Sequence, residues 1–251
     1  MALVPLGIFY GGVMTGIPVV TGVAEGVHHQ RNQNAEAADD TRMVKFYLDS
    51  FCTPNTPQGR EVNASIVVLR GDRLWLSPTD ETSGLPVDGS HHPFTGFYIQ
   101  YPDEERSPPQ RGLVSTISVD PPMLNWIYVD RETLGLRYGN RTASIAHVVG
   151  PWDWTDDEVG VTLEGWEGFC AVEVPEEDRL DGLKWALYYD IDNDKMGGGE
   201  MVGGATVLQV SLERRILPED LRRQQEEAAD QKMQVTSHGD MKAQWGGKAV
   251  S

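Results

Sequence analysis

Short β-rich segments recur along most of this chain at intervals of about ten residues, and turn residues separate them. Branched and aromatic side chains fill the segments, whereas Gly, Pro, Asp and Asn fill the gaps. This rhythm predicts a mainly β fold, namely a single antiparallel β-sandwich or barrel. The predicted strands cover residues 44–49, 64–70, 73–77, 96–101, 113–119, 124–129, 134–138, 144–149, 159–164, 169–174, 184–190 and 205–212.

The rest of the chain divides around this β domain. At 251 residues, one domain with extensions is the expected organisation. Two long polar stretches within the domain, 77–95 and 102–112, are expected to be loops. The predicted order is a glycine-rich apolar segment and short helix at 1–43, the β-sandwich or barrel domain at 44–216, a charged helix at 217–234 that opens with Pro218, and a disordered tail at 235–251.

The apolar segment at residues 1–27 is the most unusual part of the sequence. It contains three small-xxx-small steps, Gly7/Gly11, Gly12/Gly16 and Gly22/Gly26, a spacing that lets another backbone approach an apolar helix. It lacks the basic start of a signal peptide and the flanking charges of a membrane span. We expect it to meet a protein partner, a membrane or another copy of the chain, or else to cover the sheet.

Acidic side chains dominate the charge. The net charge is −17, and residues 151–200 alone hold 15 Asp and Glu against 3 Lys and Arg. Such a surface repels phosphate backbones and anionic lipid head groups, so the sequence predicts no nucleic-acid partner. A cation, a basic protein or a small ligand remains open as a partner, as does a simple role in solubility.

The number and spacing of the cysteines indicate the cellular compartment in which the protein works. Cys52 and Cys170 are far apart and have no metal-ligand spacing, which argues against a secreted disulfide scaffold. We therefore expect two buried thiols in a cytoplasmic protein, with membrane association through residues 1–27 as the alternative.

Alternating carboxylates follow one predicted strand. Asp190, Asp192 and Asp194 precede a run of glycines, and oxygen donors at every second residue can converge on one calcium ion. However, Lys195 stands where an EF-hand loop has glycine, and Met201 where it has glutamate. The sequence thus offers a calcium site here, against the alternative of an acidic surface turn.

Tryptophans and carboxylates gather between residues 152 and 167. Paired carboxylates beside indole rings occur in carbohydrate sites and in glycosidases. We therefore expect Asp153 and Glu164 as acid/base candidates, although packing of the rings in a β core explains the same pattern. The ligand-binding candidates are Trp152, Trp154 and Trp166.

His147 is a third catalytic candidate, because it is the one histidine inside a predicted strand. The alternative is a histidine with a structural role in the sheet.

Several blocks of the chain resemble a group of hypothetical proteins from filamentous ascomycete fungi. The resemblance covers nearly the whole chain and implies a fungal source, but it implies no particular chemistry. The blocks that carry it are PPMLNWIYVD at 121–130, GPWDWT at 150–155, LEGWEGF at 163–169, WALYYD at 185–190, GIPVVTG at 16–22 and the region 37–46.

Three functions follow from these features. The first is a non-catalytic β-sandwich module that binds a ligand or partner and needs no cofactor. The second is a membrane-active or oligomerising protein that uses residues 1–27. The third is a β-barrel enzyme with a cleft lined by tryptophan and carboxylate side chains, a class that carries no linear motif.

Overall fold

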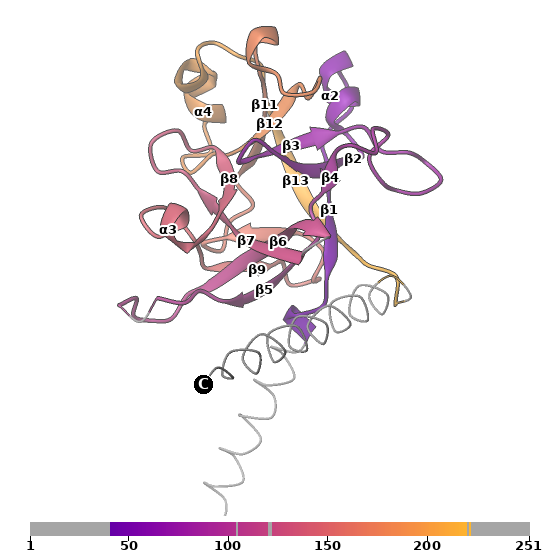
Figure 1. The fold of residues 1–251 in the computed structure, drawn as a ribbon. Coiled ribbons are helices and arrows are strands. Elements are labelled where there is room, and N and C mark those ends of the chain that lie inside the picture. Colours follow the sequence, from indigo (N-terminus) through magenta and orange to yellow (C-terminus); the bar gives the residue numbers. More distant parts are fainter. Residues whose placement is uncertain (1–40, 104, 120–121, 220, 222–251) are drawn as a thin grey trace, which may run out of the picture. The chain divides into compact units, whose positions relative to one another are not determined.

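A computed structural model describes residues 41–103, 105–119, 122–219 and 221 of the chain (Figure 1). The apolar segment at 1–27, most of the charged helix at 217–234 and the tail at 235–251 lie outside these residues, so their predicted roles stay predictions. Within the described residues, no helix has the length and apolar character needed to cross a membrane.

Strands are the main regular structure of the described chain, and loops and short helical turns connect them. The helices are α2 (Pro57–Val62), α3 (Arg141–Ser144) and α4 (Lys195–Gly198), with 3-10 turns η1 (Glu176–Asp178) and η2 (Glu200–Val202). The strands are β1 (Phe46–Phe51), β2 (Ser65–Arg70), β3 (Arg73–Ser77), β4 (His92–Pro93), β5 (Gly96–Gln100), β6 (Arg111–Val119), β7 (Pro122–Val129), β8 (Leu136–Gly139), β9 (Trp152–Trp154), β10 (Val161–Leu163), β11 (Phe169–Glu173), β12 (Trp185–Tyr189) and β13 (Val207–Ile216).

Six of the strands pair in a closed ring. β1 pairs with β13, β13 with β11 and β11 with β12; β12 then pairs with β3, β3 with β2, and β2 returns to β1. All these pairings are antiparallel. A closed ring leaves no exposed sheet edge, which is how all-β folds avoid edge-to-edge association. The predicted antiparallel barrel is therefore confirmed.

β5, β6, β7 and β8 form a second path from β1 to β3. Figure 1 shows β5, β6 and β7 together with β9 in the lower part of the molecule, below the ring strands β2, β3 and β12.

Side chains on both faces of the ring strands are buried. In β3, Leu74 and Leu76 belong to the large core cluster, whereas Trp75 between them packs into a second cluster on the opposite face. Alternate residues of a strand point to opposite faces, so burial on both sides requires an unbroken apolar run. The run Ile66–Leu69 in β2 meets that requirement, since each of its side chains is at most 4% exposed.

A tight turn joins β2 to β3, as the sequence predicts. Arg70 pairs with Arg73, and the two residues between them, Gly71 and Asp72, have φ angles of 55° and 63°. Two consecutive left-handed residues form the turn that best matches the twist of a β-hairpin.

The predicted strand at 144–149 is wrong. The helix α3 instead ends at Ser144, and residues 145–147 form a turn. Asn140 caps α3 by accepting a hydrogen bond from the Ala143 N–H at 3.0 Å. Side-chain capping of this kind favours a helical turn over a strand. Only Val148 joins the sheet, through an isolated bridge to Val129.

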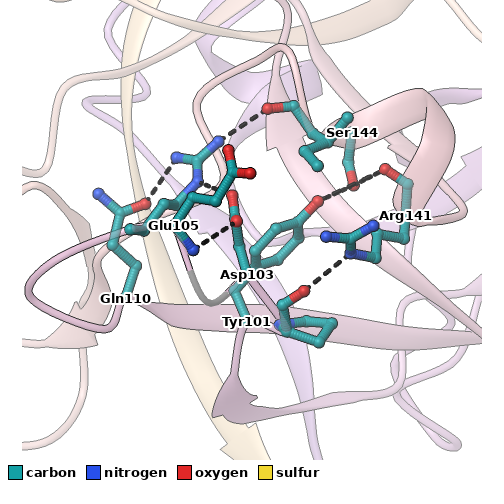
Figure 2. Close-up of polar contacts among 9 residues, drawn as sticks. Tyr101, Asp103, Glu105, Gln110, Arg141 and Ser144 are labelled. Atoms are coloured by element: carbon teal, nitrogen blue, oxygen red, sulfur yellow. Dashed lines mark hydrogen bonds and ion pairs between the residues drawn. The ribbon is translucent and has the colours of Figure 1, made fainter.

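The expected loop at 102–112 is tied to α3 rather than free. The buried hydroxyl groups of Tyr101 and Ser144 lie 2.8 Å apart, and Arg141 donates to the Pro102 carbonyl at 2.8 Å (Figure 2). Arg106 donates to Asp103 and to the Ile145 carbonyl, each at 2.7 Å. These bonds fix the first half of the loop against α3 and the residue that follows it.

Gly96 allows β5 to approach its neighbours closely, and this suggests a direct test of the packing. A Cβ at this position would collide with the Val114 carbonyl oxygen and the Phe94 ring. We predict that Gly96→Ala lowers the free energy of unfolding by about 1 to 3 kcal/mol, since an overpacked core strains its surroundings.

The matched control is Gly89→Ala, at an exposed glycine with no heavy atom within 4 Å of the added Cβ. We expect this control to change stability by less than about 0.5 kcal/mol in the same urea titration. Equal effects of the two substitutions would contradict the tight packing at Gly96.

Candidate functional site

A cavity of about 350 Å³, here called the Trp166 cavity, opens where β11, β13 and the loop after β12 meet. Its volume lies at the lower end of the range for small-ligand sites. The side chains that give it its chemical character are Phe51, Trp166, Glu167, Asn193, Gln209 and Ser211.

A tight hairpin turn presents Trp166. Leu163 and Trp166 exchange both backbone hydrogen bonds, each at 3.0 Å. Between them Glu164 and Gly165 adopt left-handed φ angles of 55° and 78°, as a two-residue hairpin turn requires. The turn is short and bonded at both ends, so it holds the tryptophan in place.

The Trp166 ring lies over Gly168 and remains 42% exposed. A Cβ on Gly168 would collide with the indole nitrogen, so only glycine leaves room for the ring. The same nitrogen lies 3.5 Å from the Asp190 carbonyl oxygen. The nitrogen edge of the ring thus lies against the protein, while much of the residue stays exposed.

Polar groups of both hydrogen-bonding types line the same cavity. Gln209 donates from its amide nitrogen to the Asn193 side-chain oxygen at 2.8 Å, and Ser211 donates to Glu167 at 3.3 Å. An amide pair joined by one bond keeps a carbonyl oxygen and an NH₂ group at its outer ends. The cavity therefore offers donors and acceptors beside an apolar ring.

Cys170 also lines the cavity and is fully buried, with its sulfur 3.8 Å from an Asp190 carboxylate oxygen. Burial, reinforced by the Asp190 charge, raises the pKa of Cys170 to about 12. The sulfur consequently stays a neutral thiol at pH 7 and is not a reactive thiolate.

The Asp190 carboxylate anchors the loop that follows β12. It accepts backbone N–H bonds from Asp194 at 3.2 Å, Lys195 at 2.8 Å and Met196 at 3.4 Å. Lys195 and Met196 both have left-handed φ angles, near 60°, which cost energy for residues with a side chain. The buried carboxylate stabilises this conformation.

The other two carboxylates proposed for calcium lie on the surface of this loop. Asp192 is exposed, and Asp194 caps α4 by accepting the Gly197 N–H at 2.7 Å. Among the residues that the structure describes, no group of three His, Cys, Asp or Glu side chains is arranged to hold a metal ion. Calcium binding by this loop stays a prediction.

The other two tryptophans proposed as ligand-binding residues have different surroundings from Trp166. Trp152 is 1% exposed and stacks on Phe169 in the core, with ring centroids 6.1 Å apart. Trp154 lies between two guanidinium groups, at 4.5 Å from Arg42 and 4.0 Å from Arg214. Of the three tryptophans, Trp166 is the most exposed.

The two carboxylates proposed as an acid/base pair have separate structural positions. Asp153 forms ion pairs with Arg42 at 3.2 Å and with Arg111, and it also accepts the Trp154 N–H. Glu164 is exposed on the hairpin turn. Neither side chain lines the Trp166 cavity.

His147 has two structural contacts. Its ring stacks on Tyr128, with centroids 5.1 Å apart, and its Nδ1 accepts the Arg131 N–H at 3.2 Å. This bond requires the proton on Nε2 when the ring is neutral.

Sequence reasoning missed the amide pair and the serine of the cavity. Asn193, Gln209 and Ser211 belong to two different elements, and neither their types nor their spacing marks them in the sequence. The pair Glu164–Gly165 next to Trp166 was a usable signal, since a two-residue turn ending in glycine indicates an exposed hairpin tip.

Replacing Asp190 tests its anchoring role. We predict that Asp190→Ala lowers the free energy of unfolding by about 2 to 4 kcal/mol, because three N–H groups lose a charged acceptor. Asp192→Ala, two residues away and exposed, is the control and should have an effect below about 0.5 kcal/mol. Equal losses in a calcium-free urea titration would contradict the anchoring role.

Comparison with known proteins places this architecture in a family. The model of a fungal β-trefoil domain matches residues 22–218, which is most of the chain and all of the ring strands. This agrees with the resemblance to fungal proteins that the sequence blocks carry. No curated protein and no solved structure matches the chain. The chain belongs to the fungal β-trefoil domain family.

Proposed function

We propose that this protein is a binding module whose Trp166 cavity takes a neutral saccharide through a single sugar ring. The observation that carries the proposal is the exposed, fixed indole of Trp166 beside side chains that both donate and accept hydrogen bonds. The family supports it, since β-trefoil domains commonly bind proteins or carbohydrates.

The indole suits the apolar side of a sugar. A pyranose presents C–H groups on its faces. A flat aromatic ring can pack against these C–H groups, and this contact requires no hydrogen bond. Because Gly168 and the hairpin turn hold the ring in place, little side-chain entropy is lost on binding.

The amide pair suits the hydroxyl groups of the sugar. Each hydroxyl both donates and accepts, so a site that recognises adjacent hydroxyls needs both functions. Gln209 and Asn193 supply both, and the Glu167 carboxylate adds an acceptor.

The charge of the chain favours a neutral ligand. Asp190 and Glu167 line the cavity, and the protein as a whole carries a net charge of −17. Sulfated or sialylated sugars would meet electrostatic repulsion here, most strongly at low salt.

A glycan array probed with the full-length protein, followed by calorimetric titration of the best neutral glycan, tests the proposal. We predict that Trp166→Ala raises the Kd roughly tenfold or more, equal to about 1.4 kcal/mol or more. The Kd of Trp166→Phe should lie between those of the parent protein and Trp166→Ala, because phenylalanine keeps an aromatic face of smaller area. Gln209→Ala should weaken binding to a lesser degree.

Val87→Ala is the matched control, since Val87 is an apolar side chain that is 66% exposed and lies outside the cavity. It should leave the Kd unchanged. Failure of the array to show any neutral glycan would contradict the proposal, as would unchanged affinity of the Trp166→Ala variant.

A further inference from the structure

A second cavity, of about 620 Å³, lies against the pairing of β3 with β12 and is here called the His91 cavity. It has no residue in common with the Trp166 cavity. The side chains used in the argument below are Arg60, Leu76, Thr79, His91, Leu183 and Trp185.

His91 is a buried polar residue of this cavity. It is 7% exposed, and its Nδ1 lies 3.2 Å from the hydroxyl of Ser77, which is itself buried. The other ring nitrogen, Nε2, is buried without a hydrogen-bond partner among the described residues. The carboxylate of Asp88 is 3.7 Å from Nε2, too far for a hydrogen bond.

The contacts of His91 indicate which of its ring nitrogens carries the proton when the ring is neutral. The buried Ser77 hydroxyl needs an acceptor for its hydrogen bond, and among the described contacts Nδ1 of His91 is the one acceptor within reach. Nδ1 is therefore the acceptor, and in the neutral ring Nε2 carries the proton. The nearby negative charge of Asp88 favours the same tautomer. Nε2–H is thus a buried donor that lacks an acceptor.

Thr79 adds a second buried polar group that has no hydrogen-bond partner among the described residues, namely its hydroxyl oxygen. A buried polar group without a partner destabilises the fold, so two of them lining one cavity call for an external group. His91 Nε2 and Thr79 Oγ1 can each donate a hydrogen bond, and both lack an acceptor.

The remaining wall is largely apolar. Leu76, Leu183 and Trp185 are each at most 3% exposed overall and present side chains to the cavity. The Trp185 indole nitrogen is already used, since it donates to Glu61 at 3.1 Å. The wall therefore fits a hydrocarbon or aromatic body and offers it no further hydrogen bond.

Charged groups surround the opening and include both signs. Glu61 accepts from Lys184 at 2.7 Å, and that bond lowers the pKa of Glu61, so its charge is compensated within the protein. Arg60 and Glu81 are exposed at the rim. Asp88 is the negative charge nearest to His91 Nε2, and its side chain is 54% exposed, so solvent screens its repulsion of an anionic head group.

We propose that the His91 cavity binds a small carboxylic acid with an apolar body, its carboxylate accepting hydrogen bonds from His91 Nε2 and Thr79 Oγ1. A carboxylate offers two acceptor oxygens to two buried donors, and bonds to a charged acceptor are about twice as strong as neutral ones. The apolar body packs against Leu76, Leu183 and Trp185. This site is independent of the saccharide site.

Calorimetric titration of the full-length protein with benzoate at pH 7.5, and with benzamide as the neutral analogue, tests the proposal. Benzoate should bind roughly tenfold more tightly than benzamide, because its head group is charged. Thr79→Val and His91→Phe should each weaken benzoate binding roughly tenfold, since each removes one donor.

Thr79→Val removes a buried polar group that has no partner, so it should fold at least as stably as the parent protein. His91→Phe also takes the acceptor from the buried Ser77 hydroxyl, so it should be less stable than Thr79→Val but still folded at the temperature of the titration. Melting curves check this point. Thr82→Val is the matched control: it makes the same change in the same turn, at an exposed residue that does not line the cavity, and should bind benzoate as the parent does.

An NMR titration gives a second readout. The ring signals of His91, assigned by their loss in His91→Phe, should report the Nε2–H tautomer and should shift as benzoate is added. Three outcomes would overturn the proposal: His91 signals that stay fixed at saturating benzoate, benzamide binding as tight as benzoate binding, or unchanged affinity in both folded variants. Water alone would then satisfy the two donors.

Discussion

The pairing of β3 with β12 is the interaction on which the rest of this structure depends. It joins Leu76 to Trp185 and Trp75 to Ala186, two strands far apart in the sequence. Loop-closure entropy makes such a contact costly, and burial of large rings has to offset it. Trp75 and Trp185 are both at most 3% exposed, and each indole nitrogen has an acceptor, in Arg70 and Glu61 respectively.

Closure of the ring places both candidate cavities. The His91 cavity is built directly on the joined strands, with Leu76 and Trp185 in its wall. The Trp166 cavity uses β11 and β13, which the same ring holds side by side. In both cases strands supply a rigid base. Loops supply His91 and Thr79 in one cavity, whereas β13 and the loop after β12 share the polar groups of the other. Two cavities without shared residues allow two ligands to bind independently.

The sequence predicts the strands well, because their signals are local. Apolar runs such as Ile66–Leu69 and the turn at Gly71–Asp72 identify β2, β3 and the hairpin between them. The strands that close the ring, β3 and β12, are far apart in the sequence, and no pattern in either strand indicates that they pair. The strand predicted at 144–149 failed because the helix that Asn140 caps extends to Ser144 and the chain then turns, which leaves only Val148 to join the sheet.

The sites were less predictable than the fold. Trp166 was a candidate from sequence, but so were Trp152 and Trp154, and only burial separates the core ring and the cation-stacked ring from the exposed one. The role proposed for His91 cannot be read from the sequence, because it depends on Ser77 and Thr79, which the fold brings near it. Unpaired buried donors are a property of three-dimensional packing, which a sequence does not display.

Native-state hydrogen exchange across the β3–β12 pair tests the central claim, a closed ring, most directly. The paired amides of Trp75, Leu76, Trp185 and Ala186 should exchange only through global unfolding, as slowly as those between β6 and β7. Fast exchange at the β3–β12 pair, with the β6–β7 amides still protected, would show an open sheet and would contradict the account.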